Sequence, residues 1–299
     1  MIDRDLPPSL TGRYDVIARL DDGRGSKQLF LAADRRGGSD AVIARFPLAD
    51  PDKLAYEIAR LQRLDSAYLP RIFDLCIESR DPYHEAYLVV EHCDGPTLAQ
   101  VVSRGALEVA DAAPILLELA RAVAAIHGVG VVWPELRLTN VMLASSAAGP
   151  RLVLLDLGLA ARLSVVDVDL AEPSRDLTPR LPYLSRELIL GWTRDPRSDA
   201  YALGVCGFRI LTGELPIPVR GDESPFEYMM RARSAVIDLA QLPAELPAAA
   251  RAILVRMLDP DRDRRPVMPE VVAAFAQAFG APSLIRHYPG SRARRADPQ

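Results

Sequence analysis

Two short segments carry residues that could handle a metal ion and a phosphorylated ligand. The segment VVWPELRLTNVML, residues 131–143, contains an acid, Glu135, and an amide, Asn140. The amide oxygen of Asn140 is a hard ligand that suits Mg²⁺, and Glu135 is a carboxylate that could act as an acid or base. Nearer the start of the chain, GRGSKQLF contains Gly23 and Gly25, and glycines let backbone amides approach phosphates closely. The combination indicates phosphoryl chemistry, in an active enzyme or in the inactive shell of one.

Composition and charge narrow the class of protein. The chain has 299 residues, of which 49% are apolar, so it can bury a large core. The net charge of -4 lacks the basic excess that is typical of nucleic-acid binders. Its three cysteines, Cys76, Cys93 and Cys206, lie far apart and suit the reducing cytoplasm better than a disulfide framework. No uncharged apolar run reaches membrane-spanning length, so we expect no membrane segment.

The order of elements indicates a small β-rich part followed by a larger helical part. Short strand patterns dominate from Tyr14 to Val90, interrupted by one helix that begins at Asp50 and Pro51. From Leu98 onward the apolar periodicity becomes helical. We expect an N-terminal arm at 1–11, an N-lobe at 12–90, a hinge at 91–95, a C-lobe at 96–280 and a basic, flexible tail at 281–299.

Four segments resemble, in this order, the protein kinase superfamily and most closely the bacterial Ser/Thr kinases: LDDGRGSKQLFLAAD, AVIARF, VVWPELRLTNVML and LVLLDLGLA. Further along, LPYLSRE ends at Glu187, Asp199 begins an apolar helix, and Arg265 is placed like the arginine that pairs with Glu187 in that family. The resemblance extends over residues 12–280. It implies a bilobal α+β fold, with a β-rich N-lobe containing one main helix and a mostly helical C-lobe. It also implies ATP and Mg²⁺ as cofactors.

The resemblance assigns the metal ligands to Asn140 and Asp156, whereas the structural alternative makes them a loop cap and a turn residue. The usual His-Arg-Asp triplet is replaced by Trp133, Pro134 and Glu135. Glu135 keeps the negative charge of the catalytic base but adds a methylene, and a misplacement of about 1 Å can cost about a hundredfold in rate. Its alternative is a solvated or salt-bridged loop residue. Trp133 is expected to fill core space.

The lysine that holds the nucleotide phosphates in this family is missing from the strand AVIARF. Its position falls on Arg45, or on Ala44 if the register slips by one. In the Arg45 register Ile43 lies over the adenine and crowds it, and arginine is not a conservative replacement for this lysine. Glu57 occupies the position of the ion-pairing helix glutamate and could pair with Arg45. Exposed strand and helix positions are the structural alternatives for Arg45 and Glu57.

A relocated lysine is the other possibility for the phosphates. Lysine occurs only at Lys27 and Lys53, and Lys27 takes the third glycine position of the loop that contains Gly23 and Gly25. This arrangement resembles the with-no-lysine kinases, in which the phosphate-binding lysine lies on this strand. The structural alternative is a solvated hairpin lysine.

The segment YLVVEHCDGPTL resembles the hinge between the kinase lobes. The resemblance places Val90 at the gate of the pocket behind the adenine and turns the backbones of Glu91 and Cys93 toward the base. Met142, two residues after the metal-binding asparagine, completes the implied nucleotide contacts. No sequence neighbour of Cys93 clearly lowers the pKa of its thiol.

The joint loss at the lysine, the acid and the adenine-facing alanine favours a pseudokinase. Such a protein is a kinase fold that acts as a regulatory or scaffold module for another protein, with weak or absent ATP binding. The alternative is an active atypical Ser/Thr kinase that uses Lys27 or Arg45 on the phosphates and Glu135 as the base. Transfer of another group from ATP, such as a nucleotidyl group, is a third option. The sequence leaves the protein partner and the oligomeric state open.

Overall fold

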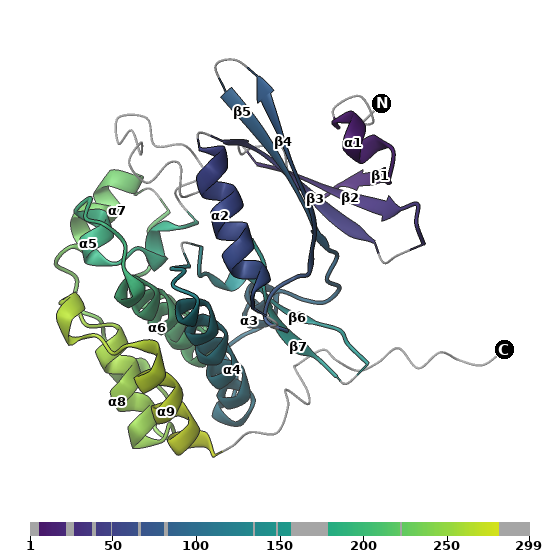
Figure 1. The fold of residues 1–299 in the computed structure, drawn as a ribbon. Helices are drawn as coiled ribbons and strands as arrows, with labels where there is room; N and C mark the ends of the chain where they lie inside the picture. Colours follow the sequence, from purple (N-terminus) through teal and green to yellow (C-terminus); the bar gives the residue numbers. More distant parts are fainter. Residues whose placement is uncertain are drawn as a thin grey trace.

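The computed structural model describes residues 6–21, 27–37, 40–48, 50–64, 67–80, 83–133, 135–147, 149–156, 179–221 and 223–280. The predictions for Gly23 and Gly25, for Pro134 and for the tail at 281–299 therefore lie outside the described residues. The described elements form a β-sheet with one main helix and a larger set of helices (Figure 1). This arrangement confirms the expected bilobal α+β fold.

The N-lobe contains an antiparallel sheet with the strand order β1-β2-β3-β5-β4. The strands are β1 (Tyr14–Arg19), β2 (Gln28–Asp34), β3 (Ala41–Leu48), β4 (Ile72–Arg80) and β5 (Tyr83–Glu91). β3 pairs with both β2 and β5, so Arg45 lies opposite Gln28 on one side and Tyr87 on the other. Because side chains alternate between the faces of a strand, this register fixes which residues of β3 face the second lobe.

The outer face of the sheet is covered by the start of the chain. Helix α1 (Pro8–Thr11) places Leu10 in a buried cluster with Tyr14 and Ile43, and Leu6 joins the same cluster. Residues 6–11 are therefore part of the N-lobe core, which differs from the separate arm expected at 1–11. The physical reason is apolar burial, because each buried leucine side chain contributes about 1.5–3 kcal/mol.

The inner face of the sheet packs against helix α2 (Pro51–Gln62). Ala44 of β3 shares the main core with Ile58 of this helix. Asp50 caps α2 by accepting a hydrogen bond from the backbone N–H of Lys53 at 2.9 Å, as the Asp-Pro pair predicts. In Figure 1 the helix lies alongside β3, β4 and β5, between the sheet and the C-lobe helices.

The C-lobe is built around the buried helix α6 (Pro196–Thr212), against which α4 and α8 pack. Its N-cap is Asp195, and the left-handed backbone of Gly213, with φ of 79°, ends it. The other C-lobe helices are α3 (Leu98–Val102), α4 (Val109–Gly128), α5 (Arg186–Ile189), α7 (Pro225–Ala232), α8 (Ala248–Met257) and α9 (Met268–Phe279). Within the described ranges, no helix is both long enough and apolar enough to cross a bilayer.

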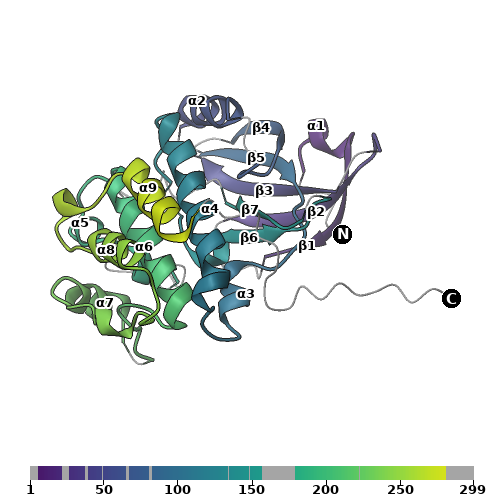
Figure 2. The same cartoon turned by 90° about the horizontal axis from the view of Figure 1, so that it is seen from below.

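The two lobes meet where the chain leaves β5 and at a short hairpin of β6 (Val141–Ala144) and β7 (Arg151–Leu154). Gly95 lies in the crossing segment with φ of 151°, and a Cβ atom there would lie 2.2 Å from the carbonyl oxygen of Leu143. The hairpin lies beside α3 in both views (Figures 1 and 2). It carries the candidate metal ligands to the interface between the lobes.

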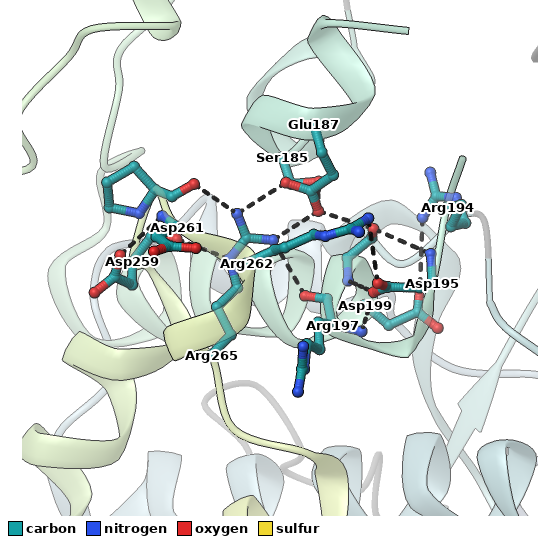
Figure 3. A network of polar contacts seen from close by, with 12 residues as sticks. Ser185, Glu187, Arg194, Asp195, Arg197, Asp199, Asp259, Asp261, Arg262 and Arg265 are labelled. Carbon is teal, nitrogen blue, oxygen red and sulfur yellow. Dashed lines mark hydrogen bonds and ion pairs between the residues drawn. The ribbon is translucent and has the colours of Figure 1, made fainter. Parts of the chain in front are cut away.

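A buried polar network ties the segment around Glu187 to the rest of the C-lobe (Figure 3). Arg265 donates to both carboxylate oxygens of Glu187, at 2.7 and 3.0 Å, and both side chains are almost fully buried. This is the pair that the sequence predicts. Ser185 and Ser198 also donate to Glu187, at 2.6 and 2.9 Å. Burial alone raises the pKa of Glu187, but the hydrogen bonds from Arg265 and Ser185 lower it below its ordinary value.

Candidate active site

Asn140 and Asp156, the expected metal ligands, are brought close by the β6–β7 hairpin. The backbone N–H of Leu155 donates to the carbonyl of Asn140 at 2.7 Å, which extends the ladder of the hairpin. The amide nitrogen of Asn140 donates to the backbone carbonyl of Glu135 at 3.0 Å. The side-chain oxygen of Asn140 therefore stays an acceptor, 3.5 Å from the hydroxyl of Thr139. Asn140 thus holds the loop and keeps an oxygen that suits a cation.

Asp156 has a left-handed backbone, with φ of 59°. It is the one non-glycine residue with positive φ in the part of the chain that the structure describes. Such conformations cost on the order of 1 kcal/mol or more and gather at functional sites. Oδ1 of Asp156 lies 2.7 Å from Nζ of Lys27, and the two side chains are 24% and 23% exposed. The structure therefore brings together Lys27 and Asp156, which the sequence analysis proposed for phosphate binding and metal binding.

Lys27 reaches Asp156 because of the strand register. It directly precedes β2 and lies on the same face as Leu29, which packs against the main core. Leu29 pairs with Ala44 of β3, whose side chain belongs to that core. Ala44 therefore holds the position of β3 that faces α2 and the main core, and it offers only a methyl group there.

Arg45 lies on the outer face of β3, which corrects the register that places it on the nucleotide phosphates. Its Nε donates to Glu85 at 2.6 Å, its Nη1 donates to Gln28 at 3.4 Å, and its guanidinium lies 5.8 Å from the ring centroid of Tyr87. Ile43 is fully buried on that same face and does not face the cleft either. The reason is geometric, because a shift of one residue moves every side chain of a strand to the other face.

Glu57 is buried on α2, with 8% of its surface exposed. Glu57 is therefore not the exposed helical glutamate that the sequence analysis gave as the alternative. α2 covers the inner face of the sheet, whereas Arg45 extends from the outer face. The two side chains that the sequence suggested as an ion pair therefore start from opposite sides of the sheet.

Glu135 is buried between two arginines, with 5% of its surface exposed. Nε of Arg180 lies 3.2 Å from its Oε1, and Nε of Arg137 lies 3.3 Å from its Oε2. The second contact is an ion pair without hydrogen-bond geometry, since neither atom has a hydrogen-bond partner among the described residues. Burial raises the pKa of the Glu135 carboxyl, and the positive charges of Arg180 and Arg137 oppose this increase without cancelling it. The salt-bridged alternative describes this geometry.

The two arginines around Glu135 are site residues that the sequence reasoning missed. Arg137 follows Glu135 by two residues, so an opposite charge within the same loop was a signal that could have been used. Arg180 directly precedes a 3₁₀ turn at Leu181–Tyr183, which packs against α6 and α7. No local pattern links Arg180 to a residue so far away in the sequence.

Asp199 fixes the backbone at the front of the loop that carries Glu135. It is fully buried, and its Oδ2 accepts a hydrogen bond from the backbone N–H of Trp133 at 2.6 Å. The same oxygen lies 2.8 Å from Nε2 of His127, and Arg194 donates to Oδ1 at 3.3 Å. Trp133 is fully buried, as expected for a core residue. These contacts hold the loop whatever its chemistry.

Two of the residues expected to contact the nucleotide, Cys93 and Met142, lie together where the hinge meets the hairpin. One small buried cluster contains Cys93, Met142, Ala144, Val153 and Leu155. Within the described part of the chain, the backbone N–H of Cys93 makes no hydrogen bond, so it remains a donor for a ligand. The N–H of Glu91, in contrast, donates to the carbonyl of Arg71 at 2.8 Å. Val90, three residues before Cys93, is partly buried and packs against the main core.

The chain belongs to the protein kinase family, because the family model for the protein kinase domain matches residues 44–275. Serine/threonine-protein kinase pkn2 of Myxococcus xanthus is 29% identical over an alignment of 309 positions. The alignment covers 95% of this chain and 36% of that protein. Serine/threonine-protein kinase PrkC of Bacillus subtilis is 28% identical over 250 residues, which cover 81% and 35%. The chain thus spans about a third of the length of the curated relatives that it matches.

Proposed function

We propose that this chain is a catalytically impaired protein kinase homologue, a pseudokinase, that acts as a regulatory or scaffold module for another protein. The observation that carries the proposal is the position of Glu135, buried and paired with Arg180 and Arg137. Phosphoryl transfer requires an acid within hydrogen-bond reach of the acceptor hydroxyl. Here the carboxylate is 5% exposed and each of its oxygens lies within 3.3 Å of an arginine, which supports a structural role.

The phosphate side of the reaction is weakened as well. Ala44 offers a methyl group on the face of β3 that packs against the main core, and the side chain of Arg45 lies on the outer face. Transfer depends mainly on positioning and on neutralising the charge that develops on the phosphate oxygens. Loss of the strand cation and withdrawal of the acid therefore act on the same step, and together they support an inactive site.

The cleft still suits a nucleotide. The N–H of Cys93 can donate to the edge of a purine, and the partly buried side chain of Met142 offers apolar surface nearby. The side-chain oxygen of Asn140 suits Mg²⁺, but the carboxylate of Asp156 already contacts the ammonium of Lys27. The described residues therefore fit the nucleotide better than they fit the metal ion.

An active atypical Ser/Thr kinase is the second candidate, and one observation favours it. Lys27 lies 2.7 Å from Asp156, so a lysine is present near the position of the phosphates. In that reading Lys27 neutralises the phosphates and Glu135 orients the hydroxyl after Arg180 moves away. Such a movement would leave a buried carboxylate with one fewer partner, which is unfavourable.

A transfer assay separates the two candidates. Purified chain with Mg²⁺ and radiolabelled ATP is expected to label neither itself nor generic Ser/Thr substrates. An active bacterial Ser/Thr kinase domain, assayed in parallel, shows that transfer is detectable. Robust labelling by the wild-type chain that disappears in Asp156→Ala would overturn the pseudokinase proposal.

A protein partner follows from the loss of transfer, because a kinase fold without chemistry acts through its surfaces. The net charge of -4 gives no basic excess for nucleic acid. Within the described residues Cys76, Cys93 and Cys206 are free thiols, which suits the cytoplasm as the place of action. The relatives are about three times longer than this chain. The proposal therefore concerns only the kinase-like domain that they share with it.

A further inference from the structure

We infer that the cleft binds the phosphates of a nucleoside di- or triphosphate without a divalent cation, because Lys27 takes the place of Mg²⁺ on Asp156. The inference rests on the nucleotide-binding cleft of the proposed function. The inference adds that the positive charge that neutralises the phosphates comes from Lys27 and not from a bound metal ion. The ligand is therefore the uncomplexed nucleotide.

The contact itself is short and partly withdrawn from water. Nζ of Lys27 lies 2.7 Å from Oδ1 of Asp156, within the range of a charge-assisted hydrogen bond. About three quarters of each side chain is buried, so solvent screens this pair less than a surface pair. An ammonium group has three donors, and one of them is used on the carboxylate. The remaining donors can bind phosphate oxygens in the same cleft.

Magnesium competes with this ammonium for the same oxygen. Mg²⁺ requires oxygen ligands at about 2.0–2.1 Å in a near-octahedral arrangement. A cation at that distance from Oδ1 of Asp156 would lie close to Nζ of Lys27, and the two positive charges repel. The carboxylate also has Oδ2, but a cation bound there would still lie only a few ångströms from Nζ, so Lys27 disfavours Mg²⁺ on either oxygen.

Few other oxygens in the described part of the cleft could hold Mg²⁺. Asn140 is neutral and contributes a single oxygen. Glu135 is engaged by Arg180 and Arg137. Among the described residues, no group of three or more acidic, histidine or cysteine side chains is suited to a metal ion. A divalent cation would therefore depend on one carboxylate that already has a cation.

The rest of the site also favours a built-in cation at this position. Ala44 leaves no cation at its position on β3. The only other lysine, Lys53, is exposed near the start of α2. Lys27 is thus the lysine that the fold places at the phosphates, and its contact with Asp156 fixes its position before a ligand arrives.

Isothermal titration with ATP, in excess EDTA and in MgCl₂, tests the inference. The wild-type chain is expected to bind ATP with Kd values that differ by less than about threefold between the two conditions. Lys27→Met is expected to lose at least about tenfold in affinity in EDTA and to recover part of it with Mg²⁺, because the ammonium no longer repels a cation at Asp156. Lys53→Met is the matched control and is expected to behave like the wild type.

Two outcomes would overturn the inference: wild-type binding that tightens at least tenfold with Mg²⁺, or no ATP binding in either condition. The wild-type comparison needs no variant, so it stands even if Lys27→Met does not fold. The transfer assay is scored separately. Magnesium-dependent binding without transfer contradicts the built-in cation and leaves the pseudokinase proposal intact, whereas Mg²⁺-dependent transfer contradicts both.

Discussion

Nε of Arg180 lies 3.2 Å from Oε1 of Glu135, and this contact joins the loop before β6 to the segment before α5. Only 5% of the surface of Glu135 is exposed. Arg137 approaches the other oxygen at 3.3 Å without forming a hydrogen bond of good geometry. Glu135 thus lies in a buried cluster of opposite charges.

The first prediction concerns the charge of Glu135. Its pKa is raised above the ordinary value of 4.5 mainly by burial. Between pH 4.5 and the folded-state pKa, Glu135 is protonated in the folded chain and ionised in the unfolded chain. The stability of the wild type therefore falls as pH rises through this range. The glutamine in Glu135→Gln does not titrate. At pH 7 the free energy of unfolding of this variant is therefore expected to exceed that of the wild type by about 0–2 kcal/mol.

Urea denaturation at pH 4, 5.5 and 7 measures the difference between Glu135→Gln and the wild type. The advantage of the variant is expected to grow with pH across this range. Arg180→Ala is the complementary change. It is expected to cost about 1–2 kcal/mol at pH 7, less than a fully buried pair, because Arg137 remains and Arg180 is 31% exposed. If the difference in stability between Glu135→Gln and the wild type were the same at every pH, the role of the buried charge would be refuted.

The second prediction concerns the buried pair of Glu187 and Arg265. Arg265→Leu leaves a buried carboxylate without its cation and is expected to cost about 3–5 kcal/mol in the free energy of unfolding. The matched control is Arg197→Ala. Arg197 pairs with Asp263 at 2.7 Å on the surface, where the two side chains are 36% and 73% exposed. Surface pairs contribute about 0–1 kcal/mol, so equal costs for both variants would contradict the assignment.

The same pair has a defined pH dependence. The pKa of Glu187 is lowered below 4.5, so its contribution to stability is fully present above 4.5 and is lost as pH falls through the folded-state pKa. The difference in stability between the wild type and Arg265→Leu is therefore expected to shrink below pH 4. Denaturation of both proteins at pH 3 and pH 6 checks this sign.

The third prediction concerns the thiol of Cys93. Burial raises its pKa to about 11, with a smaller contribution from Glu91, and the thiolate is the reactive form. At pH 7.5 iodoacetamide is expected to label Cys93 at least about tenfold more slowly than the partly exposed Cys76. Unfolded chain, which labels every cysteine, is the control. Fast labelling of Cys93 in the folded chain, measured by mass spectrometry of peptides, would contradict its burial.

The sequence predicted the fold because the order of the kinase-like segments constrains the whole chain at once. It also predicted the pair of Glu187 and Arg265, whose positions in those segments are fixed. The register of β3 was harder, because AVIARF is apolar on both sides of Arg45 and alternation alone does not show which face is buried. Only the pairing with β2 and β5 resolves it.

Partners from distant segments were the part of the site that no local pattern could show. Lys27 was recognised as a candidate from its place in the glycine loop, but its contact with Asp156 depends on how the two lobes close. Arg180 was missed because its partner, Glu135, is far away in the sequence. Charged residues in loops are common on surfaces, so their pairing is decided by tertiary structure and not by spacing.

The last prediction concerns Gly95, between the lobes. Its φ of 151° disfavours any other residue, and a Cβ atom there would lie 2.2 Å from the carbonyl oxygen of Leu143. Gly95→Ala therefore combines backbone strain with a clash against backbone. Gly105→Ala is the matched control, because Gly105 has φ of 126° but nothing within 4 Å of a Cβ. Strain alone costs about 1–3 kcal/mol.

We expect Gly105→Ala to fall within that range and Gly95→Ala to exceed it by about 2 kcal/mol or more, because β6 must move away from the hinge. Since β6 carries Met142 and follows Asn140, that movement is also expected to weaken ATP binding in Gly95→Ala and to leave it unchanged in Gly105→Ala. Thermal unfolding with and without ATP measures both effects. Equal losses in the two variants would mean that the contact of Gly95 with Leu143 does not set the spacing between hinge and hairpin.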